Sequence, residues 1–205
     1  MAEAEVLPIP AGEQCARRPG RPRSERAERA ILDAALELFG EHGVDGVSME
    51  TVAARAGVGK ATIYRRWPGK EELLLDALAQ LRSPLPEPRG ESVREDLVAM
   101  LAVMLRDAAD PARTRRYALL LGEGDKYPRL LRRYKETVLE PRQEMISSVL
   151  RRGVASGELR PDADVEVAMY MLTGAVMARG KHAEGNPAGF AERVVDEALL
   201  GLRAR

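Results

Sequence analysis

The residues whose types and spacing could do chemistry lie between Ser48 and Lys70, in the segment SMETVAARAGVGKATIYRRWPGK. A short amphipathic stretch is followed by a glycine turn and by a second stretch with basic and aromatic side chains. Two short helices joined in this way place the second one in the major groove of DNA, where its first residues contact base edges. The chemistry that this segment predicts is therefore hydrogen bonding to bases and phosphates.

The predicted recognition helix runs from about Lys60 to Arg66. Lys60 could donate to O6 and N7 of guanine, and the methyl groups of Ala61 and Thr62 could contact a thymine methyl group. Residues further along this helix and at neighbouring helix starts could contact bases or phosphates. These further candidates are Ser48, Tyr64, Arg65, Arg66 and Lys70.

Helical periodicity predicts the elements that position this segment. We expect a first helix from about Ser24 to His42, with one apolar face, and a second helix capped by Ser48 and ended by Gly57. Pro68 should end the third helix, and a fourth should run from about residue 70 to 81. The apolar face of the first helix would consist of Ile31, Leu32, Ala35, Leu38 and Phe39.

Beyond a proline-rich break at residues 83–90, every segment again has a helical pattern. Cap residues predict helix starts at Ser92, at Asp110-Pro111, at Pro128 and at Asn186-Pro187. The helix from Pro128 would reach about residue 156 with a kink at Pro141, and another helix would cover roughly 164–180. No strand alternation persists, so we expect an all-α protein of about nine helices.

We divide the chain into three parts. Residues 1–22 form a basic tail that we expect to be disordered, residues 23–69 a helix-turn-helix DNA-binding domain, and residues 70–205 a helical ligand-binding and dimerisation domain. The 205 residues are 45% apolar and 31% charged, which allows a packed core. The net charge is zero, so any DNA-binding signal must come from local clusters of basic residues.

A single cysteine, Cys15, excludes a disulfide framework and fits a reducing compartment. We see neither a signal-peptide core nor an apolar run that approaches the roughly 18 residues of a membrane span. We therefore expect a cytoplasmic, nucleoid-associated protein without a membrane partner.

Residues 24–78 resemble the N-terminal domain of the TetR family of transcriptional regulators, through ILDAALELFGEHGVDGVSMETVAARAGVGKATIYRRWPGKEELLLDAL. The resemblance implies a homodimer that binds double-stranded DNA at a palindromic operator, and a larger helical domain for a small-molecule effector. It also adds Met49 to the DNA contacts. Gly59 and Gly69 depart from the serine or threonine usual at these helix starts, and both changes would loosen a helix start without removing a base contact.

The basic tail offers a second mode of DNA binding. An extended arm with Arg18, Arg21 and Arg23 could enter a narrow A·T minor groove. The alternative is a flexible tail that attracts phosphates without sequence preference. The sequence leaves both open.

The helix at 164–180 has apolar residues on two sides, so it needs two partners. One is its own domain, and the other is a second subunit, although a monomer in which this helix is simply central remains an alternative. The predicted dimer interface consists of Val167, Met171, Gly174, Ala178, Val194, Val195, Ala198, Leu199 and Leu202. The candidate lining of an effector pocket consists of Met100, Met104, Tyr117, Leu120, Tyr134, Met145, Met169, Tyr170, Thr173 and Met177, where methionine adapts to irregular ligands.

Catalysis is not expected. The two histidines, His42 and His182, have no partners at metal-ligand spacing, so we predict no metal site, and we expect no cofactor. Residues 57–60 resemble part of a phosphate loop, but Ala61 stands where Ser or Thr is required and no strand precedes the loop. We predict a ligand-responsive transcriptional repressor; the alternative is an architectural or cofactor-recruiting DNA-binding module without a small-molecule input.

Overall fold

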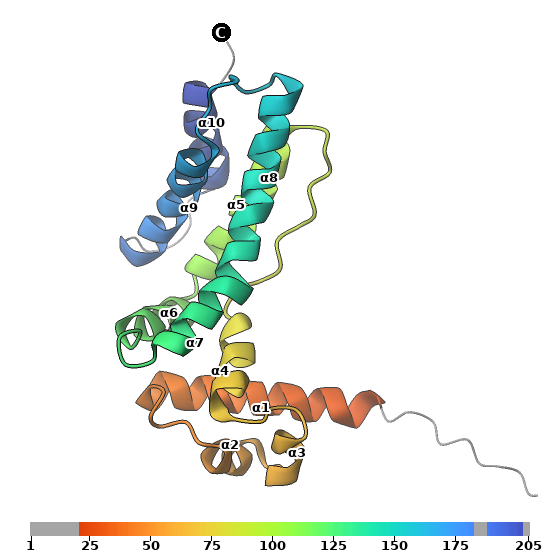
Figure 1. Ribbon diagram of the computed structural model, residues 1–205, viewed down its shortest axis with the longest axis vertical. Helices are drawn as coiled ribbons and strands as arrows, with labels where there is room; N and C mark the ends of the chain where they lie inside the picture. Colours follow the sequence, from red (N-terminus) through yellow and green to blue (C-terminus); the bar gives the residue numbers. More distant parts are fainter. Residues whose placement is uncertain (1–20, 183–187, 203–205) are drawn as a thin grey trace, which may run out of the picture.

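Helices α1 to α4 form one end of an elongated molecule (Figure 1). The computed structural model describes residues 21–182 and 188–202. α1 (Arg21–His42) lies across α4 (Lys70–Ala79), and α2 (Met49–Ala56) and α3 (Lys60–Tyr64) lie on the other side of α1 from the rest of the chain. The expected apolar face of α1, residues 31, 32, 35, 38 and 39, is buried.

The other end of the molecule is built from long helices (Figure 1). α5 (Val93–Ala108) and α8 (Glu140–Ser156) run beside each other, and α9 (Val165–His182) and α10 (Phe190–Leu202) pack against them. α6 (Pro111–Gly122) and α7 (Pro128–Tyr134) lie between the two ends. The described residues contain no strand, which confirms the all-α fold.

Two apolar cores hold the chain together. The first joins α1, α2, α3 and α4, and Leu120, Leu130 and Tyr134 of α6 and α7 are buried in it. The second joins α5, α8, α9 and α10. α4 therefore packs with the N-terminal helices, although the predicted division at residue 69 assigns it to the C-terminal part.

Several helix starts confirm the cap predictions. The Ser92 hydroxyl accepts a hydrogen bond from Glu95 N at 3.3 Å. Asp110 accepts from Ala112 N at 2.9 Å, with Pro111 in the first turn of α6. The prediction for Asn186-Pro187 lies outside the described residues.

The helix expected from Pro128 to 156 is interrupted as Pro141 requires. A π-helical turn, η1 (Lys135–Leu139), separates α7 from α8, and the Glu140 amide donates to the Lys135 carbonyl. Pro141 has no N–H for the Thr137 carbonyl, and its ring would crowd an α-helical turn. The wider turn accommodates the proline, and Leu139 of this turn and Arg142 just beyond it line a cavity.

Candidate nucleic-acid interface and effector cavity

Side-chain and backbone caps fix the junction between α2 and α3. The Ser48 hydroxyl accepts from Thr51 N at 3.1 Å, and the Thr51 hydroxyl accepts from Ser48 N at 2.9 Å, which is a reciprocal capping box. Gly57 ends α2 with φ +66°, a conformation that glycine adopts without strain. Gly59 caps α3 without any side-chain hydrogen bond, and α3 ends at Tyr64, two residues earlier than expected.

Buried residues on one side of α3 orient its other side outward. Ile63 is fully buried, and Trp67 just beyond the helix is buried with its Nε1 donating to Asp76 Oδ2 at 2.8 Å. Sequence reasoning missed Trp67, whose position directly after two arginines was the available signal. Because both residues belong to the first core, they anchor α3 to the other N-terminal helices.

The predicted base-contacting residues lie on the outward side of α3. Lys60, Ala61 and Arg65 are exposed, and Thr62 is half-buried. Tyr64 is 50% exposed, one of the few large hydrophobic side chains at the surface. Lys60 Nζ lies 3.0 Å from Glu50 Oε1 of α2, and this contact is the main cause of the lowered pKa of the Glu50 carboxyl.

Three of the predicted DNA-contacting side chains are engaged within the protein. Met49 is only 5% exposed, because its side chain is part of the first core. Arg66 donates to Glu28 of α1. Lys70 Nζ donates to the Val44 carbonyl at 3.2 Å and lies 5.8 Å from the centre of the Tyr127 ring. The last two cations therefore serve contacts within the protein in this structure.

The N-terminal arm is also different from the prediction. α1 begins at Arg21, so the backbone of Arg21 and Arg23 is helical and not extended. Pro22 is tolerated there because the first helical turn needs no donor from its position. Arg18 lies outside the described residues.

A polar joint connects the turn after α1 with the turn between α6 and α7. Glu123 Oε2 accepts from Val44 N at 2.9 Å. Asp45 accepts from Lys126 Nζ and from the Tyr127 hydroxyl, and these two hydrogen bonds lower the pKa of the Asp45 carboxyl. The joint brings α6 and α7 into direct contact with the DNA-binding end. Sequence reasoning missed it, since its partners are about eighty positions apart.

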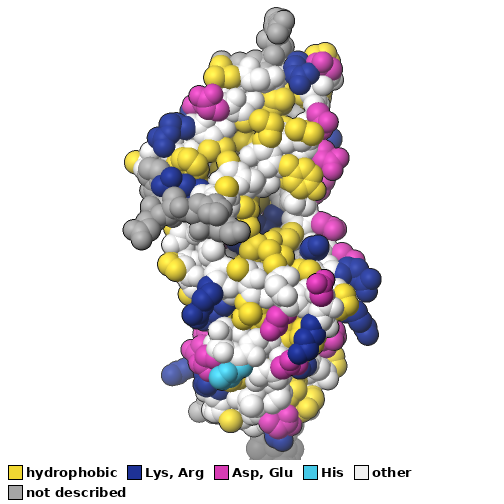
Figure 2. Space-filling view, turned by 90° about the vertical axis from the view of Figure 1, so that its left-hand side faces the viewer, with side chains coloured by type: hydrophobic (Ala, Val, Ile, Leu, Met, Phe, Trp, Pro, Cys, Tyr) yellow, Lys and Arg dark blue, Asp and Glu magenta, His cyan; other side chains and the backbone are white. Residues whose placement is uncertain are grey.

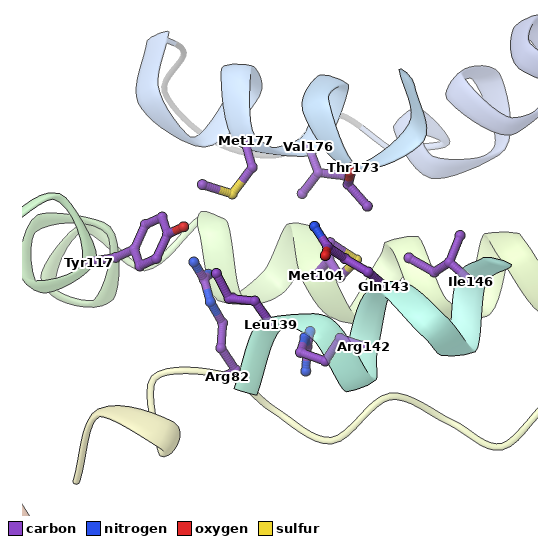
Figure 3. A pocket seen from close by; sticks show the side chains of 10 residues that line it. All are labelled: Arg82, Met104, Tyr117, Leu139, Arg142, Gln143, Ile146, Thr173, Val176 and Met177. Carbon is purple, nitrogen blue, oxygen red and sulfur yellow. The ribbon is translucent and has the colours of Figure 1, made fainter. Parts of the chain in front are cut away.

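A partly open cavity of about 110 Å³ lies between the end of α4 and α5, α6, α8 and α9 (Figure 3). Four of the predicted lining residues surround it, namely Met104, Tyr117, Thr173 and Met177. The prediction missed the remaining six, which are Arg82, Leu139, Arg142, Gln143, Ile146 and Val176. It favoured methionines and tyrosines, and so passed over the charged and amide side chains.

The other predicted lining residues lie elsewhere. Leu120 and Tyr134 are buried in the first core, and Met100 and Met169 in the second. Met145 packs against the second core, and Tyr170 is 54% exposed on the outer face of α9.

The polar side of the cavity contains two guanidinium groups. The Arg82 guanidinium lies 4.3 Å from the centre of the Tyr117 ring. Arg142 donates to the Ser83 carbonyl, and its side chain is only 14% exposed, so burial lowers the pKa of this guanidinium. Asp107 of α5 accepts from Ser83 N at 2.8 Å and from Arg113 Nη1 at 2.7 Å.

The exposed face of α9 bears much of the apolar surface of the C-terminal part. Val167, Met171, Gly174 and Ala178 are exposed, as predicted for interface residues, and Tyr170 and Met177 extend this surface. Figure 2 shows hydrophobic side chains gathered on the upper half of this side of the molecule.

α10 contributes to that surface differently from the prediction. Val195, Ala198, Leu199 and Leu202 are buried in the second core, and Val194 packs partly against it. Leu200 is the exposed apolar residue of α10, at 62%. The single apolar stripe of this helix therefore serves its own domain.

Other kinds of site find no support in the described part of the chain. No three His, Cys, Asp or Glu side chains are grouped there as metal ligands would be. Within the same ranges, no helix is long and apolar enough to cross a membrane.

Comparisons with known proteins match both ends of the fold. A family model described as bacterial regulatory proteins of the tetR family matches residues 31–77, and one described as the tetracyclin repressor-like C-terminal domain matches residues 87–198. The HTH-type transcriptional regulator YdeS of Bacillus subtilis (strain 168) is 34% identical over 78% of this chain and 81% of its own. The DNA-binding transcriptional repressor TetR of Mycobacteroides abscessus is 32% identical over 88% of this chain and 95% of its own.

A solved structure shares the fold over nearly the whole length. MexZ, a key repressor responsible for antibiotic resistance in Pseudomonas aeruginosa, has a TM-score of 0.69 at 26% identity. The match covers 88% of this chain and 96% of MexZ.

Proposed function

Because this chain belongs to the TetR family of DNA-binding transcriptional regulators, we propose that α3 recognises its operator and that a small molecule in the cavity releases it. The observation that carries the first half is the outward row on α3, where Lys60, Ala61, Tyr64 and Arg65 are exposed above buried Ile63. A helix with this face fits the major groove. Ser48 and the start of α2 would contact the phosphates beside it.

Regulators of this family bind DNA and act as dimers. We propose that the exposed apolar face of α9, with Leu200 of α10, is the surface that pairs. Val167, Tyr170 and Met171 are each more than half exposed, and an apolar patch of this kind marks an interaction site. Two α3 helices about 34–36 Å apart would then match a palindrome.

Two structural connections between the cavity and the DNA-binding end support release by an effector. Arg82, which lines the cavity, follows α4, whose Leu73, Leu74 and Leu78 are buried in the first core. Tyr117 of α6 lines the cavity as well, and the turn after α6 carries Glu123 of the polar joint. A ligand that binds better to one arrangement of these helices would shift the population toward it and change the spacing of the two α3 helices.

Selection of bound sequences from random DNA tests the operator proposal. We expect a palindrome with half-sites about one helical turn apart. In the selected operator, Lys60→Ala with Tyr64→Ala should weaken specific binding by about tenfold or more, since one good base contact is worth roughly 1–3 kcal/mol. The control is Arg151→Ala, which removes an exposed cation of α8 far from α3. Undiminished binding by the double variant would refute the assignment of α3.

The dimer surface is tested by Met171→Glu, which puts a charge into the centre of the proposed interface. We expect monomers in sedimentation velocity, with unchanged helix content. Leu121→Glu is the matched control, because Leu121 is an exposed leucine on α6, outside the α9 face. A dimer that survives Met171→Glu would exclude this face.

A further inference from the structure

The effector cavity has a cationic end and an apolar end (Figure 3). Arg82 and Tyr117 lie together at one end, with the Tyr117 hydroxyl beside the Arg82 guanidinium. Ile146 lies at the opposite end, Val176 of α9 lies above the middle of the space, and Met177 of α9 lies above the end with Arg82 and Tyr117. Figure 2 shows basic surface set into a hollow that is bordered by hydrophobic side chains. A molecule that fits both ends must combine a polar head with an apolar body.

The charges around the cavity do not balance. No Asp or Glu is among the residues that line it, as far as the structure describes the chain. The carboxylate of Asp107 accepts hydrogen bonds from Arg113, Ser83 N and the Ser83 hydroxyl at 2.6–2.8 Å, and Arg142 Nη2 is 3.8 Å away from it. In the described residues, Arg82 forms no ion pair and instead lies over the Tyr117 ring.

Burial makes this excess of positive charge costly in free energy. Arg142 is mostly withdrawn from solvent, and desolvation lowers its pKa. The Tyr134 hydroxyl nearby is buried, and burial raises its pKa, while its interaction with the Arg82 guanidinium and the charge of Arg142 act in the opposite direction. Two guanidiniums that share so little counter-charge in a low-dielectric site favour a bound anion.

We infer that the effector is a small organic acid, whose carboxylate lies against Arg82 and Tyr117 and whose apolar chain or ring packs against Val176 and Ile146. This inference rests on the proposed role of the cavity as the effector site. An Arg guanidinium binds a carboxylate through paired hydrogen bonds, which gives geometry as well as charge. A cationic amphiphile of the same size would meet repulsion from Arg82 and has no carboxylate to contact.

Titration calorimetry with three matched probes tests the class of ligand. The full chain without DNA is titrated with octanoate, octan-1-ol and octylamine at one ionic strength. We expect octanoate to bind about tenfold or more tightly than the alcohol, since hydrogen bonds to charged groups are worth roughly 1.5–3 kcal/mol, and octylamine to show no saturable binding. A second pair, 2-naphthoate and 2-naphthol, separates a flat ring from a flexible chain. Equal binding of acid and alcohol, tighter binding of the amine, or no binding of either acid would overturn the inference.

The variant Arg82→Gln tests whether Arg82 causes the preference for the acid over the alcohol. We expect it to lose the tenfold advantage of octanoate and to leave the affinity for octan-1-ol unchanged. Arg151→Gln, on the exposed side of α8, is the matched control and should keep the preference. Arg142→Gln is a second variant with the same expected direction, and thermal unfolding shows whether it still folds. Operator binding is measured on the same preparations, so a failed acid preference and a failed operator proposal appear in different assays.

Discussion

The DNA-binding end and the C-terminal end of this protein differ in whether they bury charged side chains. Among the described residues, the first core buries no charged side chain. The charged residues of the helices around it lie at the surface or in the polar joint. The C-terminal part buries two carboxylates of α5, Asp96 and Asp107. Both accept hydrogen bonds from the proline-rich segment that follows α4.

The two buried carboxylates hold the proline-rich segment, which has no helical hydrogen bonds of its own, against α5. Asp107 accepts from Ser83 at one end of the segment, and Asp96 accepts from Arg89 N at 2.8 Å and Gly90 N at 3.1 Å at the other. Buried backbone donors need partners, and two carboxylates supply them here. Apolar periodicity therefore orders the DNA-binding end, and buried charge orders the connection to the effector domain.

The largest effect should follow the loss of the more heavily used carboxylate. Asp107→Ala leaves Ser83 N without its partner and removes the more buried of the two ion pairs of Arg113, so we expect a loss of about 3–5 kcal/mol in the free energy of unfolding. Urea denaturation followed by circular dichroism measures it. Asp110→Ala, which removes the cap of α6 and a half-exposed ion pair with Arg113, should cost about 0.5–2 kcal/mol. Similar losses in the two variants would contradict the special role of buried charge.

A pH dependence should distinguish the second carboxylate. Burial raises the pKa of Asp96, but hydrogen bonds from the Arg89 and Gly90 amides and from Arg152 outweigh it, so the pKa is lowered in the folded state. Its stabilisation is therefore present above the unfolded pKa of about 3.9 and is lost as the pH falls through the folded value.

Asp96→Asn should accordingly destabilise the protein by about 1.5–3 kcal/mol near neutral pH. The difference from the wild type should shrink below about pH 4, where the carboxylate itself becomes protonated. Free energies of unfolding from pH 3 to 7 for both proteins check this. A difference that stays constant over the whole range would show that the Asp96 charge has no part in holding the segment.

Two glycines in the DNA-binding end separate backbone strain from contact with the effector domain. Gly43 and Gly57 have nearly the same φ, +67° and +66°. A Cβ on Gly57 meets nothing within 4 Å, so Gly57→Ala should cost about 1–2 kcal/mol from strain alone. A Cβ on Gly43 would lie 2.1 Å from Glu123 Oε1, so Gly43→Ala must also displace Glu123 from Val44 N.

We expect the second variant to lose about 1–3 kcal/mol more, the value of a buried donor left without a partner. Thermal and urea unfolding of the two variants side by side measure the difference. Equal stability of Gly43→Ala and Gly57→Ala would mean that the hydrogen bond from Val44 N to Glu123 contributes nothing to the attachment of α6 and α7.

The contrast between the two ends of the molecule also explains which features could be predicted from the sequence. The helix-turn-helix could be predicted because its determinants are local: Ser48 caps α2, Gly57 turns the chain, and Ile63 anchors α3. The burial of Met49 could not be predicted. A methionine in the first turn of a helix beside a basic segment has the same sequence pattern whether its side chain faces the core or the DNA.

The cavity could not be assembled from the sequence because its polar residues come from separate elements. Arg82, Tyr117, Arg142 and Thr173 are brought together only by the packing of the whole domain. α10 was misassigned for a related reason. Its one apolar stripe can serve only one partner, and the sequence does not say whether that partner is its own core or a second subunit.

The smallest effect on stability should accompany a measurable gain in DNA affinity. Lys60 and Glu50 form an ion pair in which both side chains are more than half exposed, and such a pair is worth about 0–1 kcal/mol. Glu50→Gln should therefore leave the free energy of unfolding nearly unchanged.

The same variant should tighten operator binding, because Glu50 competes with DNA for Lys60 and itself repels phosphates. Fluorescence anisotropy at low salt should show a gain of a few-fold that fades as salt is added, since the attraction is electrostatic. In a Lys60→Ala background, the part of the gain that depends on releasing Lys60 must disappear. If Glu50→Gln gives the same gain with and without Lys60, the carboxylate acts on DNA directly and does not compete with DNA for Lys60.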